Sequence, residues 1–313
     1  MVRLALAATL LAGGCSGGPE IDCDACRPRP PSTLFVTDRG GDSILRYDGV
    51  TGQFDDVFAS GLAARIDRPS SVRLGPSGHL YLAGFGRGDV VRFDVESGAM
   101  MDVFYWDTQL LEEPVELMFR GDDLIVLGND TQNAVVIDPA GTAARSFGYP
   151  EMRAAHDFVL TPDDTTVVVA TDTHPQLGSA IQVWDATTGT MVRHFGTPDE
   201  LTSATSIALA GDGRLYACDY ERNQIARFDP ATGELVGIVV DTTSGLLDAP
   251  VSIDFGPDGA LYALDRVGIH RIDPDTGEEM SLLISVGDGH NEAPRSFTFA
   301  TKTAIAAAIA RTH

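Results

Sequence analysis

The sequence predicts an all-β protein, a six-bladed β-propeller built from four-stranded blades. The first observation behind this prediction is a phrase that recurs six times in the 313 residues. The phrase contains two hydrophobic runs, and the Asp that closes the second run recurs every 44 to 47 residues, at Asp48, Asp94, Asp138, Asp185, Asp229 and Asp273. A fixed period of this length is typical of repeat folds. The second observation is that each repeat divides into four short runs with strand-like alternation, while helix signals are nearly absent.

Each repeat begins with a run whose apolar residues alternate, as in Val72 and Leu74 or Ile253 and Phe255. A tight turn follows, for example residues 256–259, where Pro257 fixes the entry and Gly259 accepts positive φ. The second strand is expected at positions such as 261–264 and the third ends at the repeated Asp. A fourth, outermost strand is expected at 56–58, 101–104 and 192–195. Four strands per period predict one blade per repeat.

The two ends of the repeat region are complementary. The N-terminal repeat starts directly at a second strand, near Thr33, and an unmatched first strand, Pro294–Ala300, lies at the other end. We therefore expect this last strand to complete the first blade and close the ring, which removes exposed strand edges. The predicted propeller spans residues 33–300. A C-terminal tail at 301–313 is expected to add a strand or to fray.

The first 14 residues predict a signal peptide. A short positive start at Arg3 precedes a nine-residue apolar run, 4–12, which is too short to cross a bilayer. Small residues directly before Cys15 resemble the lipobox of bacterial lipoproteins, although Ala12 stands where that motif usually has Leu. The resemblance implies lipidation of Cys15 and a bacterial cell-envelope location, with the propeller in the periplasm or at the cell surface. Ordinary signal cleavage and no export are the alternatives.

Residues 15–32 are rich in Pro and Gly and predict a disordered tether. Cys23 and Cys26 lie within it, and in an exported segment a local disulfide is the expected fate. Half of a metal site or a redox pair would need a partner motif that the sequence lacks.

The acidic composition excludes some partners. A formal net charge of −23 argues against nucleic acid and against an anionic membrane face, because both require clustered Lys and Arg. We expect a monomer that attaches to the membrane only through the lipid, and whose partner is an envelope protein or a small ligand.

The fullest repeat, Ala249–Gly277, resembles NHL repeats and related six-bladed propellers. The resemblance covers roughly residues 32–300 and weakens in the third repeat, where Asp122 and Asp123 replace a Gly-containing turn, and in the fourth, which has an insertion at 173–178. Members of this group include binding scaffolds, lyases and sugar lactonases, so the resemblance implies the fold and leaves the function open.

Alignment of the six first strands indicates a candidate site at the mouth of the central channel. Four repeats place Ser at one equivalent position, at Ser71, Ser206, Ser252 and Ser296, and the third and fourth place Glu116 and Asp157 there. The preceding position carries His156 and Arg295 in two repeats. Two carboxylates beside an imidazole are a candidate ligand-binding set, a site for a divalent cation (Ca²⁺ or Mg²⁺), or an acid–base pair. The alternative is a structural role, in which these groups satisfy backbone polar atoms.

Other recurring polar residues suggest scaffold roles. Asp38, Asp219 and Asp265 end second strands, where a carboxylate caps turn amides. Arg46, Arg92, Arg227 and Arg271 recur two residues before the repeated Asp and predict pairing between blades or exposed charge. His174, in the fourth-repeat insertion, is a minor candidate for binding.

No familiar catalytic motif is visible, neither a nucleophile elbow nor a zinc-binding helix motif nor a phosphate loop. The sequence therefore favours a non-catalytic binding or protein-interaction scaffold tethered to the bacterial envelope. The alternative is a metal-assisted lyase or lactonase that acts at the channel mouth through Glu116, Asp157 and His156. Catalytic residues cannot be assigned from sequence.

Overall fold

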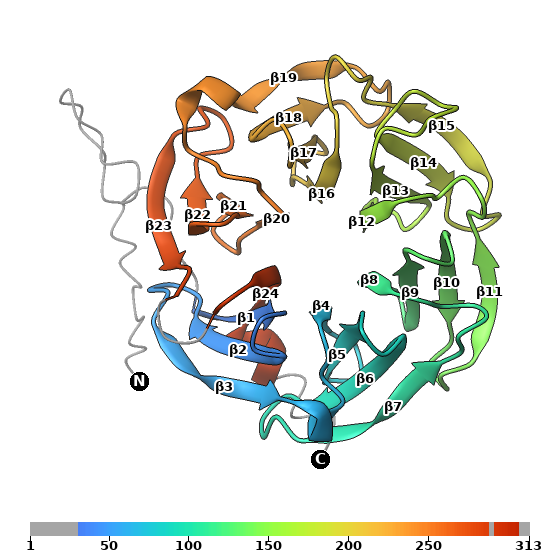
Figure 1. The fold of residues 1–313 in the computed structure, drawn as a ribbon, viewed down its shortest axis with the longest axis vertical. Helices are drawn as coiled ribbons and strands as arrows, with labels where there is room; N and C mark the ends of the chain where they lie inside the picture. The colour runs from blue at the N-terminus through green and yellow to red at the C-terminus, as the bar shows by residue number, and fades with distance from the viewer. Residues whose placement is uncertain (1–30, 288–290, 307–313) are drawn as a thin grey trace, which may run out of the picture.

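The computed structural model describes residues 31–287 and 291–306, which form six four-stranded antiparallel sheets arranged as blades around a central axis (Figure 1). The innermost strands surround the axis and the outermost strands form the rim. The predicted six-bladed β-propeller is thus confirmed.

The strands follow the repeat. Blade one contains β1 (Ser32–Asp38), β2 (Ser43–Asp48), β3 (Phe54–Ser60) and β24 (Pro294–Thr301); blade two contains β4 (Pro69–Leu74), β5 (His79–Gly84), β6 (Asp89–Asp94) and β7 (Met100–Trp106). Blade three contains β8 (Pro114–Arg120), β9 (Asp123–Gly128), β10 (Asn133–Ile137) and β11 (Ala143–Phe147); blade four contains β12 (Ala155–Leu160), β13 (Thr166–Thr171), β14 (Ile181–Asp185) and β15 (Met191–Phe195). Blade five contains β16 (Ala204–Leu209), β17 (Leu215–Asp219), β18 (Gln224–Phe228) and β19 (Leu235–Val240); blade six contains β20 (Ser252–Phe255), β21 (Leu261–Leu264), β22 (Gly268–Ile272) and β23 (Glu279–Ser285). Two short 3₁₀ helices, Leu62–Ala64 and Thr242–Ser244, lie in the loops that precede blades two and six.

The two ends of the repeat region pair with each other. β24 lies antiparallel to β1, with Ser32 opposite Thr301 and Val36 opposite Phe297. The last strand is therefore the innermost strand of the first blade, as the strand count predicted.

The tail does not add a further strand within the described residues. Residues 302–306 form a helical turn, and the hydroxyl of Thr301 accepts a hydrogen bond from the backbone N–H of Ala304 at 3.1 Å. A Thr cap followed by an alanine-rich segment favours helix over strand.

The hydrophobic core consists of separate clusters, each between two neighbouring blades. One cluster joins blades two and three, where the Tyr81 ring packs edge-on against Phe104 and Phe119 with centroids 5.1 and 4.9 Å away. Each blade buries both faces of its inner strands in this way, which explains why the second strands read as almost continuous apolar runs.

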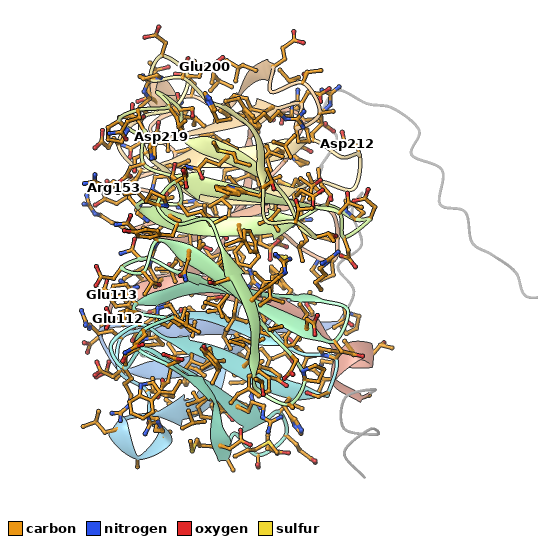
Figure 2. The ribbon with its side chains drawn as sticks, turned by 90° about the vertical axis from the view of Figure 1, so that its right-hand side faces the viewer. Glu112, Glu113, Arg153, Glu200, Asp212 and Asp219 are labelled. Atoms are coloured by element: carbon orange, nitrogen blue, oxygen red, sulfur yellow. The ribbon has the colours of Figure 1, made fainter. Side chains whose placement is uncertain are left out.

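Two faces of the ring differ in their loops (Figure 2). We call the upper face the one formed by the loops between the second and third strand of each blade and by the loops that lead into each first strand. Glu113, Arg153 and Asp219 lie on this face, at the left of Figure 2, and Asp212 lies on the opposite face. The carboxylates that end second strands cap upper-face turns, as predicted: Asp38 accepts from the N–H groups of Gly40 and Gly41 at 3.1 and 3.2 Å.

The recurring arginines pair within their own blade, so the predicted pairing between blades is wrong. Arg46 bonds Asp56 at 3.0 Å, Arg92 bonds Asp102 at 2.8 Å and the fully buried Arg271 bonds Asp258 at 2.8 Å. For Arg46 and Arg92 the reason is the antiparallel register, which places Asp56 and Asp102 of the fourth strand opposite them. Asp258, the partner of Arg271, lies instead in the turn between the first and second strands.

Several predictions fall on residues 1–30, outside the described part of the chain. These are the signal peptide, lipidation of Cys15 and the Cys23–Cys26 disulfide. In the described residues, Cys218 is a buried free thiol, and no helical segment there is long and apolar enough to cross a bilayer.

Candidate functional site

A recurring β-bulge shapes the channel mouth. In blades two to five the pairing between first and second strand slips by one residue, so that Ser70, Val115, His156 and Thr205 are left without an opposite partner. Such a bulge re-aims side chains at the rim of a channel. Consecutive residues, such as His156 and Asp157, therefore line the same cavity, although a regular strand would send them to opposite faces.

The cavity at the mouth is small. It has a volume of about 10 Å³ open to the centre of a water molecule, which is room for about one water. Its walls come from the innermost strands of all six blades and include Glu116, His156, Asp157 and Arg295. The other lining residues are Ser70, Val115, Thr205, Ser206, Val251, Ser252 and Ser296. The structure thus brings the four predicted ligand-binding residues together around one cavity.

Glu116 is held by its own strand and by residues of blade two. Its Oε1 accepts a hydrogen bond from the hydroxyl of Ser71 at 2.5 Å and one from the N–H of Leu117 at 3.1 Å. The guanidinium of Arg73 lies 3.3 Å from the same oxygen. One carboxylate oxygen therefore receives three donors from the protein.

Asp157, in the adjacent blade four, is held in the same manner by residues of blade five. Its Oδ2 accepts from the hydroxyl of Ser206 at 2.5 Å and from the N–H of Ile207 at 3.0 Å, while Oδ1 accepts from its own neighbour, the N–H of Phe158, at 2.7 Å. Burial raises the pKa of Asp157 to about 7, and the nearby Glu116 carboxylate adds to the shift. A carboxyl group in this state exchanges a proton near neutral pH.

Sequence reasoning missed two charged residues deeper in the channel, Arg73 and Asp254. They lie two positions after the aligned Ser71 and Ser252, where the other repeats carry Met118, Val159, Ala208 and Thr298. Burial would lower the pKa of Arg73, but Glu116, Asp254 and Asp157 together raise it. Burial also raises the pKa of Asp254. Extending the strand alignment by two residues would have exposed these two positions.

His156 makes a contact that the sequence did not predict. Its Nε2 lies 3.1 Å from Oδ1 of Asp172, which also accepts a hydrogen bond from the hydroxyl of Ser203 at 2.6 Å. The hydrogen bond with His156 lowers the pKa of Asp172. The imidazole is thus oriented toward Asp172 on the upper face while its residue lines the cavity. His174, the minor candidate, is buried in the insertion, and its Nδ1 accepts from the N–H groups of Gln176 and Leu177 at 3.3 and 3.2 Å.

The charged groups at the mouth do not form an evident metal cage. Within residues 31–287 and 291–306, no group of three or more His, Cys, Asp or Glu side chains is placed to hold a metal ion. Glu116 and Asp157 each use lone pairs to accept hydrogen bonds from protein groups. The prediction that they bind Ca²⁺ or Mg²⁺ has not been tested.

Comparison with known proteins defines the fold alone. No family model matches the chain and no curated protein matches it. Among solved structures, this chain is similar to a chain from the crystal structure of a nidogen/laminin complex. The match covers 86% of this chain and 98% of that chain, with a TM-score of 0.67 and 13% sequence identity. At this identity the similarity extends to the propeller fold and no further.

Proposed function

We propose that this protein is a non-catalytic binding scaffold whose upper face holds a partner protein. The observation that carries the proposal is a pocket of about 270 Å³ among the upper-face loops of blades five, six and one. Val251 lines both this pocket and the channel cavity, so the two are adjacent. The pocket is the size of a few side chains, whereas the channel cavity admits about one water.

The walls of the pocket suit a protein partner. Apolar residues, Ala249, Val251, Val286 and Pro294, form one part of its wall, and Tyr220, Asp265, Arg266 and Glu292 add polar groups. Tyr220 and Arg266 are held in place, because the guanidinium donates to the Tyr220 hydroxyl at 3.0 Å and lies 5.8 Å from its ring. Apolar lining residues together with an aromatic side chain and an arginine are typical of protein-binding hot spots. The propeller fold, shared with a chain from a nidogen/laminin complex, is compatible with this role.

Envelope tethering belongs to the same proposal. The apolar run 4–12, followed by Cys15 and a Pro- and Gly-rich segment, supports export and a lipid anchor, with the propeller held away from the membrane. An NHL-like repeat pattern is compatible with this role.

The alternative, a metal-assisted lyase or lactonase, draws support from one observation, the raised pKa of Asp157 beside Glu116. Its difficulty is space, because a substrate would have to displace the residues that close the channel. Metal analysis separates the two proposals. A stoichiometric divalent cation in the purified protein, lost in the Glu116→Ala/Asp157→Ala double variant, would favour the enzyme.

Site-specific photocrosslinking tests the scaffold proposal. A photoreactive amino acid replaces Tyr220 on the upper face or Val192 on the rim, and the full chain is produced in cells that make it naturally. Both side chains are exposed, at 38% and 61%. We expect one discrete crosslinked species from position 220 and none from position 192. Identical products from both positions, or none from position 220, would contradict the proposal.

A further inference from the structure

Two arginines flank one phenylalanine on the upper face, between blades one and two, and the charge of a third arginine acts on one of them. Arg39 follows β1, Arg68 precedes β4, Arg295 belongs to β24 and Phe85 follows β5. The guanidinium carbons of Arg39 and Arg68 lie 4.5 and 5.1 Å from the centroid of the Phe85 ring. We call these four residues the arginine platform.

The platform is built into the fold. Phe85 packs against the apolar cluster that contains Val115 and Phe158, so its ring is anchored. The N–H of Arg39 donates to the carbonyl of Ala293 at 3.0 Å, which ties it to the chain leading into Arg295. Stacking on an aromatic ring fixes the plane of a guanidinium and leaves its edge free to donate.

The platform arginines have little direct contact with carboxylates, although the more distant charges of Asp157 and Glu116 act on Arg295. In the described part of the chain, no carboxylate lies within 4 Å of Arg39 or Arg295, and Arg68 has only Asp67 at 3.9 Å. The side chain of Arg39 donates to the Pro69 carbonyl at 3.4 Å, and that of Arg295 to the Val251 carbonyl at 3.0 Å. A guanidinium has five N–H donors, so most of their capacity is not used by the protein.

Other arginines on the same face are paired. Arg65 bonds Asp89 at 2.9 Å, and Arg266 lies 3.2 Å from Asp248. The mutual repulsion in the platform is visible at Arg39. Burial, and then the charges of Arg295 and Arg68, lower its pKa to about 10, against a smaller opposing effect of Glu113. Like charges with so few carboxylate contacts favour the binding of an anion, even in a protein of net charge −23.

We propose that the arginine platform binds a carboxylate, presented by an acidic segment of the partner protein. This inference rests on the proposed function and specifies the chemistry of its partner. Guanidinium edges match a carboxylate in a two-pronged arrangement. The strong negative charge of the rest of the protein disfavours polyanions, so one or two carboxylates suit the platform better than a nucleic acid or a polyphosphate.

The first test uses succinate and inorganic phosphate as probes of the full chain. NMR of the arginine side-chain N–H groups follows the titration. We expect succinate to bind with a Kd on the order of millimolar and to shift the resonances of Arg39, Arg68 and Arg295. The Arg39→Gln and Arg295→Gln variants should weaken binding at least about tenfold.

Arg153→Gln is the matched control, because it removes the same charge from an exposed arginine of the same face. It should change the succinate affinity less than about twofold. Arg39→Lys keeps the charge but loses the planar, two-pronged guanidinium, so it should also weaken binding. It provides this test even if Arg39→Gln fails to fold. Equal affinity in the Arg39, Arg295 and Arg153 variants, or binding of phosphate without succinate, would overturn the inference.

The crosslinking experiment at position 220 separates the two proposals. Crosslinking in wild type that persists in Arg39→Gln/Arg295→Gln, together with no succinate binding, would leave the scaffold standing and reject the carboxylate. Specific succinate binding without any crosslinked partner would support the platform and reject the protein-binding scaffold.

Discussion

The hydroxyl of Ser206 donates a hydrogen bond of 2.5 Å to the carboxylate of Asp157, although the two residues occupy equivalent positions in neighbouring blades. Ser71 and Glu116 repeat this relationship between blades two and three, also at 2.5 Å. At the two positions where Glu116 and Asp157 replace the recurring serine, each carboxylate thus accepts a hydrogen bond from the serine of an adjacent blade. The departures from symmetry in blades three and four therefore take part in two hydrogen-bonded pairs at the channel, one joining blades two and three and the other joining blades four and five.

The buried carboxyl group of Asp157 predicts a pH dependence of stability. The pKa of Asp157 is raised to about 7, above the ordinary value of 3.8, so the folded state binds its proton more tightly than the unfolded state. Stability should therefore be greatest below the ordinary value and fall as pH rises toward 7, by at most about 1.4 kcal/mol per unit. In Asp157→Asn the fall between pH 5 and 8 should be smaller. Urea midpoints across that range measure it.

Asp130→Asn serves as the control, because Asp130 is an exposed upper-face residue. It should retain the wild-type pH profile. A profile for Asp157→Asn that is as steep as that of wild type would show that the proton is taken up elsewhere.

A second pH effect is expected at His270 in blade six. The buried imidazole lies 2.7 Å from Oε1 of Glu279 and 3.1 Å from Oδ1 of Asp265. Burial would lower its pKa, but these two carboxylates outweigh burial and raise it. A raised pKa gives stability that is complete below about 6.5 and is lost as pH rises through the folded value. His270→Gln should therefore cost more stability at pH 5.5 than at pH 8.5.

NMR titration of His270 provides the direct measurement. Glu279→Gln removes one carboxylate near the surface and should lower the midpoint. A His270 midpoint below the ordinary histidine value in the wild-type protein would contradict the prediction.

The fold could be predicted because its determinants are local and repeated. Alternation, turn residues and period recur six times, so errors in one blade are corrected by the others, and the unmatched strand at 294–300 reveals closure. The candidate site was predicted in part for the same reason, since alignment of the first strands places Glu116 and Asp157 on one ring of the channel.

The remainder of the site depends on information that alignment does not contain. The bulge that brings His156 and Asp157 to one cavity is a property of strand pairing. The arginine platform joins Arg39, Phe85 and Arg295, which are far apart in the chain and occupy different positions in their repeats. Only the ring geometry brings such residues together, so a repeat comparison treats each of them as an isolated polar or aromatic residue.

Close packing between blades predicts a difference between two glycines with the same backbone conformation. Gly277 and Gly259 both have φ of 74°. A Cβ at Gly277 would lie 1.8 Å from the carbonyl oxygen of Val239 in the preceding blade, whereas nothing lies within 4 Å at Gly259. Gly259→Ala should cost about 1 to 2 kcal/mol from backbone strain alone. Gly277→Ala should cost a further 1 to 3 kcal/mol or so, because the blades must separate. Equal unfolding free energies for the two variants would reject this account of the contact.

Ring closure predicts that damage to β24 weakens the whole propeller. Phe297 is 1% exposed and packs in a cluster with Leu34 of β1 and Tyr262 of blade six. Phe297→Ala should therefore cost about 3 to 5 kcal/mol, whereas Tyr149→Ala, at a position that is 73% exposed, should change stability by less than about 0.5 kcal/mol. Because β24 joins the two ends of the ring, we expect one cooperative unfolding transition at a lower temperature than in wild type. We also expect faster hydrogen exchange in β1 than in the blades away from the closure. A separate early transition with the remaining blades unaffected would show instead that blade one closes the ring without stabilising it.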